Sequence, residues 1–98
     1  MEFKKINDNL GGSFHNQTIT TSVKKLTEKL GEPNWCDRNK NEKFQYEWEV
    51  GCGEYRFYVY DWKEYRLFGK TENIQFHIGS EGMLPNNVVE EFNKFING

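Results

Sequence analysis

Apolar and polar residues alternate along three stretches in the middle of the chain, and a period of two is typical of half-buried β-strands. The stretches cover residues 44–50, 55–62 and 73–78. Gly51-Cys52-Gly53-Glu54 separates the first two and predicts a tight connection between antiparallel neighbours. A less regular stretch from Ser13 to Ile19 predicts a further, short edge strand.

The charges on the first two predicted strands indicate how they pair. If Val50 lies opposite Tyr55, apolar residues meet on one face, Trp48 with Phe57 and Tyr46 with Val59. On the other face Glu49 then meets Arg56, and Glu47 meets Tyr58. Opposite charges that face each other stabilise a strand pair, so we expect this register.

A period of 3.6 residues predicts one helix before these strands and one after them. The first begins after Thr20 or Thr21, either of which can cap it, and its buried residues are Val23, Leu26 and Leu30. Gly31 supplies its left-handed end, and Pro33 prevents its continuation. Pro85 suits the first position of the second helix, whose inner side carries Val88, Val89, Phe92, Phe95 and Ile96.

In chain order these elements predict an α+β fold. We expect an antiparallel meander sheet of three to four strands, with the two amphipathic helices packed on one face. The 98 residues suffice for one hydrophobic core, and no repeat, low-complexity tract or linker divides them. The sequence therefore predicts a single domain over residues 1–98.

The alternation sorts the strand residues onto two faces of the sheet. One set is apolar and is expected to form the core under the helices: Phe44, Tyr46, Trp48, Val50, Phe57, Val59, Ile74, Phe76 and Ile78. The other set combines aromatic rings with charged and amide groups: Gln45, Glu47, Glu49, Arg56, Tyr58, Tyr60, Trp62, Gln75 and His77. Two interpretations of this second set stay open. Its rings stiffen the sheet or pack beneath residues 1–19, because aromatic residues favour strands in any case. Alternatively, they form a recognition surface, because Trp, Tyr and Arg anchor many interfaces.

The charge and composition of the chain exclude several classes of partner. The formal net charge is −2 with acidic and basic residues interspersed, so we expect no binding to long nucleic acid. No apolar run reaches the roughly 18 residues of a membrane helix, and the first residues lack the apolar stretch of a secretory signal. We therefore expect a cytoplasmic protein that has no membrane partner.

The cysteines and histidines do not predict a metal site. Cys36 and Cys52 are the only cysteines, and in the cytoplasm we expect two reduced thiols in loops. Neither His15 nor His77 stands at a zinc-ligand spacing from them. We expect no metal and no cofactor.

The residues capable of catalysis form no recognised motif. His77 has no Ser or Cys near it in a nucleophile motif, and a single His on a strand is usually a hydrogen-bonding or stacking residue. Asp61 either ends its strand by bonding a turn or orients a polar ligand together with Lys63. Glu47 and Glu49 come from one strand, whereas the paired carboxylates of glycosidases flank a cleft. We therefore expect a binding protein and not an enzyme.

Five short motifs follow one another along the chain. They are Leu10-Gly11-Gly12, Leu30-Gly31-Glu32-Pro33, Tyr46-Glu47-Trp48, Val59-Tyr60-Asp61-Trp62-Lys63 and Phe76-His77-Ile78-Gly79. In this order they resemble a family of small, uncharacterised phage-encoded proteins, whose pattern runs G-T-S-L-x-G, F-G-x-P, A-E-W, I-Y-D-[WY]-K and W-H-I-G-G. The chain departs from that pattern where Leu30 replaces Phe, Phe76 replaces Trp and Ser80 replaces the second Gly. If that Gly lets a ligand approach the backbone, Ser80 affects the contact.

The resemblance implies a phage protein, and small phage proteins without catalytic motifs often counter host defence. We therefore expect a counter-defence protein that sequesters a small anionic ligand of nucleotide type. The residues expected to bind it are Arg56, Tyr58, Tyr60, Trp62, Lys63, His77 and Gly79. The rings would stack on a base, the basic groups would meet phosphate or base edges, and the glycine would allow close approach.

Two further expectations concern partners. A site on one copy would be shallow, so we expect a homo-oligomer that encloses the ligand between copies. The alternative hypothesis is an inhibitor that docks on a host defence enzyme through the aromatic face or through the acidic hairpin with Glu47, Glu49 and Glu54.

Overall fold

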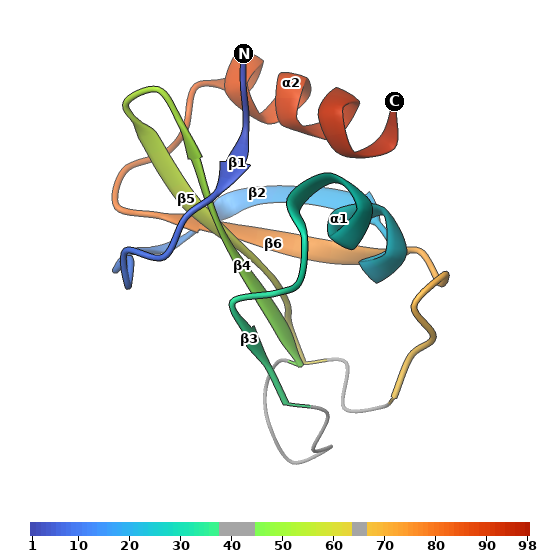
Figure 1. Cartoon of the computed structure of the whole chain (residues 1–98). Coiled ribbons are helices and arrows are strands. Elements are labelled where there is room, and N and C mark those ends of the chain that lie inside the picture. The colour runs from blue at the N-terminus through green and yellow to red at the C-terminus, as the bar shows by residue number, and fades with distance from the viewer. Residues whose placement is uncertain (38–44, 64–66) are drawn as a thin grey trace.

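The computed structural model of the chain describes residues 1–37, 45–63 and 67–98. It contains one antiparallel sheet with two helices, which confirms the predicted α+β class (Figure 1). The strands are β1 (Lys4–Lys5), β2 (Ser13–Thr21), β3 (Trp35–Cys36), β4 (Tyr46–Cys52), β5 (Tyr55–Asp61) and β6 (Ile74–Ser80). The helices are α1 (Val23–Leu30) and α2 (Asn86–Asn97). The strands follow the order β1-β4-β5-β6-β2, and β3 also pairs with β4.

The hydrophobic core lies between the helices and one face of the sheet. The buried residues of α1 are Val23, Leu26 and Leu30, and those of α2 are Val88, Phe92 and Ile96, at the predicted spacing. The predicted inner-face residues that the structure describes are all buried: Tyr46, Trp48, Val50, Phe57, Val59, Ile74, Phe76 and Ile78. Phe44, predicted to join them, lies outside the described residues. Phe57 and Phe92 meet edge to face with their ring centroids 5.0 Å apart, which joins the sheet to α2.

The edges of the sheet differ from the prediction in part. The expected strand at Ser13–Ile19 is present and continues to Thr21, where it forms the edge beside β6. At the other edge β1 and β3 were not predicted, because a strand of two residues has no measurable period. Both pair with β4: Lys4 lies opposite Gly51, and Trp35 lies opposite Glu47.

The predicted register of β4 and β5 is wrong by two residues. Glu49 lies opposite Tyr58 and Val50 opposite Phe57, because the pairing continues through Cys52 and Tyr55. The turn consists of Gly53 and Glu54 alone, and Gly53 has the positive φ of 60° that such a short turn requires. A shift of two residues leaves each side chain on its predicted face, so the two sets of residues stay separate.

The predicted helix starts and the cysteine positions need small corrections. Ser22 caps α1, and its hydroxyl accepts a hydrogen bond from the Lys25 N–H at 3.2 Å, because the two preceding threonines belong to β2. Pro85 precedes α2 as its cap residue and is not its first helical residue. Cys36 and Cys52 lie in β3 and β4 and not in loops. Cys36 pairs with the first residue of β4 and Cys52 is the last, roughly 20 Å away at the rise of a strand, too far for a disulfide.

Candidate functional site

The N-terminal segment passes over the face of the sheet that the helices leave uncovered, here called the open face. β1 pairs with β4 near one edge and β2 pairs with β6 at the other, so the residues between them must cross the sheet. Residues 6–12, here called the crossing segment, contact Glu49, Arg56 and Tyr58, which all belong to the open face. The interpretation in which the N-terminal residues cover this face is therefore correct for part of it.

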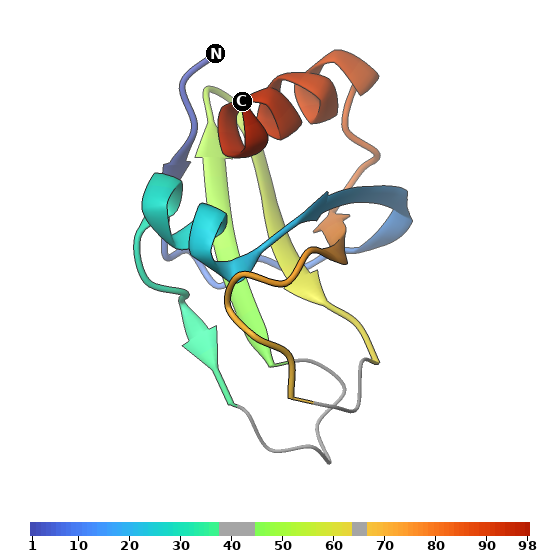
Figure 2. The same ribbon diagram turned by 90° about the vertical axis from the view of Figure 1, so that its right-hand side faces the viewer.

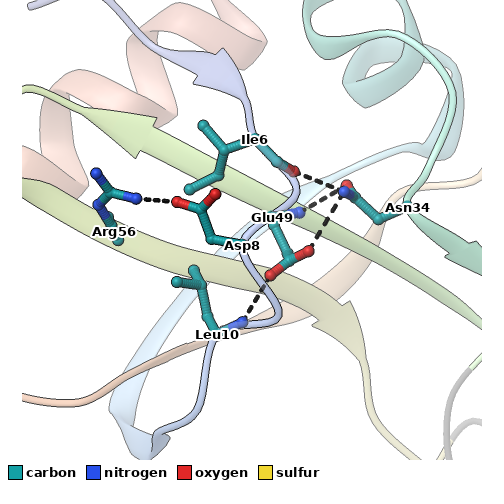
Figure 3. A network of polar contacts seen from close by, with 6 residues as sticks. All are labelled: Ile6, Asp8, Leu10, Asn34, Glu49 and Arg56. Carbon is teal, nitrogen blue, oxygen red and sulfur yellow. Dashed lines mark hydrogen bonds and ion pairs between the residues drawn. The ribbon is translucent and has the colours of Figure 1, made fainter.

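A network of polar contacts holds the crossing segment to β4 (Figure 3). The Glu49 carboxylate accepts a hydrogen bond from the Leu10 N–H at 2.8 Å and a longer one from the Asn34 side-chain amide at 3.4 Å. Asn34 also donates to the Ile6 carbonyl at 2.6 Å and accepts from the Glu49 N–H at 2.9 Å. Glu49 is consequently only 6% exposed, although it lies on the face that the helices leave uncovered.

Two of the predicted site residues are engaged by the crossing segment. The Arg56 guanidinium forms an ion pair with Asp8, and the Tyr58 hydroxyl donates to the Gly12 carbonyl at 3.1 Å. Gly79 lies opposite Tyr58 in the sheet, and a Cβ there would overlap the Tyr58 ring. The space above Gly79 was expected to admit a ligand, but the Tyr58 ring fills it in this structure.

Beyond the crossing segment, rings from β2, from β5 and from the residue that follows β5 gather around His77. The His77 ring stacks on Phe14 with centroids 4.1 Å apart and planes 14° apart. It lies 5.6 Å from Tyr60 and 6.3 Å from Trp62, and these last two rings are 5.9 Å apart. Phe14 is 38% exposed and Trp62 36%, whereas Tyr60 is only 9% exposed. We call Phe14, Tyr60, Trp62 and His77 the aromatic surface.

Two aromatic residues of the open face were not predicted as site residues. Phe14 belongs to a strand whose neighbour the sequence does not identify, so its stacking on His77 follows only from the pairing of β2 with β6. Trp35 belongs to no predicted strand, but it pairs with Glu47 and shares its face of the sheet. Trp35 is 36% exposed. A large aromatic residue inside a polar stretch was the one available signal.

The charges around the aromatic surface are few. Burial raises the pKa of the Glu47 carboxyl, and the nearby Glu49 charge raises it further. Burial also raises the pKa of the Tyr58 and Tyr60 phenols and lowers that of the His77 imidazole. At neutral pH the tyrosines and the histidine are therefore uncharged.

The two interpretations of Asp61 are resolved in favour of the structural one. Its carboxylate is fully buried and accepts hydrogen bonds from the Gln45 N–H at 2.9 Å and 3.0 Å and from the Tyr46 N–H at 2.9 Å. Asp61 thus holds the backbone where β4 begins. Lys63 is exposed, has a positive φ of 54°, and places its ammonium 5.6 Å from the centre of the Trp62 ring.

The structure brings together most of the residues predicted to bind a ligand. Tyr58, Tyr60, Trp62 and His77 form a continuous series of ring contacts, and Lys63 lies beside its end. Gly79 lies beneath Tyr58, and Arg56 is paired with Asp8. The candidate site is therefore a ring-lined strip with one basic group at its end.

Other parts of the surface offer different chemistry. A pocket of about 530 Å³ between α1, β3 and the start of β4 is lined by charges of both signs: Lys24, Lys70, Glu28 and Glu32. In the described residues no three His, Cys, Asp or Glu side chains come close enough to share a metal ion. Within that same part of the chain, no helix has the length and hydropathy to span a membrane.

Comparisons with protein-family models, with curated proteins and with solved structures found no match to this chain. The site is therefore interpreted from its own residues.

The pKa of His77 leads to a prediction about pH and stability. Because burial holds the folded-state pKa below 6.5, the unfolded chain binds the proton more readily. The stability that the neutral ring contributes is complete above pH 6.5 and is lost as the pH falls through the folded-state pKa. We expect the urea midpoint to fall between about pH 7.5 and about pH 5.5, and to fall less in His77→Gln. An equal fall in both proteins would contradict the assignment.

Proposed function

We propose that this chain is a non-catalytic binding protein that contacts its target through the aromatic surface, and that it counters host defence for a phage. The observation that supports binding is the exposure of Phe14 and Trp62 on either side of His77. Exposed rings held in place by neighbouring rings lose little conformational freedom on binding, and such residues dominate many interfaces. The counter-defence setting is supported only by the five motifs that resemble phage proteins.

The charges of the open face favour a protein as the target. Arg56 is paired with Asp8, His77 is neutral at pH 7, and Glu47 brings a carboxylate next to Tyr60. A multiply charged anion would meet Lys63 as the main basic group and would be repelled by Glu47. The weakly charged centre and the exposed rings, Trp35 included, match the composition of a protein interface core. We therefore place docking on a host defence protein before sequestration of a nucleotide.

Sequestration of a small nucleotide-type ligand is the second candidate, and one observation favours it. The Lys63 ammonium lies beside the Trp62 ring, so a base stacked on that ring would carry its phosphate close to a positive charge. This arrangement suits a ligand with one or two phosphates better than a highly charged one.

Trp62→Ala tests both candidates against a matched control. Met83 is also an exposed apolar residue, 63% exposed, but it lies in the loop after β6, so Met83→Ala removes apolar area away from the aromatic surface. Immobilised wild-type chain should retain a defence protein from bacterial lysate, and the purified protein should bind Trp62→Ala about tenfold or more weakly, the effect of losing about 1.4 kcal/mol. Met83→Ala should bind like the wild type.

Calorimetry with a panel of cyclic and linear nucleotides separates the two candidates. Nucleotide binding that Trp62→Ala weakens, without a retained protein, would favour sequestration. A target that binds wild type and Trp62→Ala equally would contradict the assignment of the aromatic surface.

A further inference from the structure

The two edges of the sheet differ in how well they are protected from pairing with a strand of another chain. β1 and β3 pair with β4 and shield its outer side over two residues each, and β1 consists of Lys4 and Lys5. Short edge strands and edge lysines are common devices that prevent a sheet from pairing with another chain. β2 forms the opposite edge with nine residues, Ser-Phe-His-Asn-Gln-Thr-Ile-Thr-Thr, and none of them is charged or proline. Figure 2 shows β2 as the blue arrow that runs across the view into α1.

One part of β2 is suited to further pairing and another is not. The register with β6 shifts between Phe14 and Gln17, and Asn16 has a positive φ of 62° at this irregularity. A bulge of this kind bends a strand edge away from a neighbour. From Gln17 to Thr21 the pairing with β6 is regular, and no strand of the described residues pairs with the outer side of β2. The regular stretch is therefore the part that is open to an added strand.

A groove lies between this edge of the sheet and α2. A groove of about 560 Å³ separates the regular part of β2 from α2, and its lining is mostly uncharged: Thr18, Ile19, Thr20, Asn73, Val89, Asn93 and Asn97, with Lys25 and Glu90. Asn97 crosses the groove at one end and donates to the Thr20 carbonyl at 3.1 Å. α2 therefore contacts β2 at Thr20 and Thr21, and the Thr20 carbonyl oxygen keeps a second lone pair for an added strand.

The central three residues of this stretch, Thr18-Ile19-Thr20, read the same in both directions, whereas its end residues Gln17 and Thr21 differ. In an antiparallel pair with a two-fold axis at Ile19, Thr18 of one copy lies opposite Thr20 of the other, and Ile19 lies opposite Ile19. Thr–Thr pairs and pairs of β-branched apolar residues stabilise neighbouring strands. No like charges meet, because the stretch has no charge.

We propose that two copies of this chain join through β2, antiparallel and with the two-fold axis at Ile19, into one continuous sheet. Phe14 belongs to β2, and His77 lies opposite Thr18 in β6, so the aromatic surface of each copy begins at the strand that forms the junction. The dimer places both aromatic surfaces on the same side of a sheet of twice the width. This pairing does not depend on the proposed function, and it defines a two-fold symmetric surface for whatever target binds.

A pair of double variants tests the junction and its register by sedimentation equilibrium. Thr18→Lys with Thr20→Lys places lysine opposite lysine twice across the axis, so this variant should be a monomer where the wild type is a dimer. Thr18→Lys with Thr20→Glu places lysine opposite glutamate twice, so this variant should remain a dimer. Thr20 is exposed and Thr18 is half-buried, so we expect both substitutions to preserve the fold. Thermal unfolding of each variant checks this.

Cysteine pairs give a second readout of the same register. In a Cys36→Ser background, an oxidised mixture of Thr18→Cys and Thr20→Cys chains should form a cross-linked dimer, because opposed residues lie about 4.5–5.5 Å apart at Cα. Either variant alone should cross-link much less. A wild type that is monomeric at all concentrations would overturn the proposal. Two double variants that both remain dimers would also overturn it, and so would equal cross-linking of the mixture and of either single-cysteine variant alone.

Discussion

Asp61→Ala is expected to lower the free energy of unfolding by about 4 kcal/mol. The carboxylate is fully buried and accepts the backbone N–H groups of Gln45 and Tyr46 at 2.9 Å to 3.0 Å. Alanine removes the acceptor and leaves both donors in a buried site, where each unpaired donor costs about 1–3 kcal/mol. Urea denaturation followed by fluorescence measures the loss, which is large against the roughly 5–15 kcal/mol of a typical domain.

Asp61→Asn is the matched control for this prediction. Its side-chain oxygen still accepts one backbone N–H, but the amide group at the other position is a donor and cannot accept. The loss should therefore lie between those of wild type and Asp61→Ala. If Asp61→Ala unfolds within about 0.5 kcal/mol of the wild type, the bonds to β4 do not carry the stability assigned to them.

Gly12→Ala is expected to destabilise the fold by about 3 kcal/mol. Gly12 has a φ of 139°, which side-chain-bearing residues rarely adopt, and a Cβ there would lie 2.6 Å from the Ser80 carbonyl oxygen and 2.8 Å from the Glu81 nitrogen. These are backbone atoms and cannot rotate away. The crossing segment must therefore shift at its end, and the Gly12 carbonyl would withdraw from the Tyr58 hydroxyl.

The neighbouring glycine provides a control at almost the same place. A Cβ at Gly11 would meet no atom within 4 Å, and its φ lies outside the strained range, so Gly11→Ala should stay within about 0.5 kcal/mol of the wild type. Thermal and urea unfolding of the two variants compares them directly. Equal stability of Gly12→Ala and Gly11→Ala would mean that the close passage of the crossing segment over Ser80 does not form in solution.

The alternation of residue types predicted the two faces of the sheet correctly, although the register was wrong. Which side a strand residue faces depends on its own position along the strand, so Trp48 and Val59 could be assigned to the core without knowing their neighbours. The register depends on where the turn begins. Charge pairing favoured Glu49 opposite Arg56, but Gly51 and Cys52 continue β4 and Arg56 pairs with Asp8 instead.

The pattern of apolar and polar residues along the sequence determined the class of fold, the buried faces of the two helices and the inner residues of the sheet. It also placed several aromatic residues on the open face. These depend on residues within a few positions of one another, whose spacing matches the geometry of a helix or a strand. Only the tertiary structure decided which of those rings remain accessible. Leu10 covers Glu49 and Phe14 stacks on His77 across separations of 39 and 63 residues, and contacts this distant depend on the path of the whole chain over the sheet.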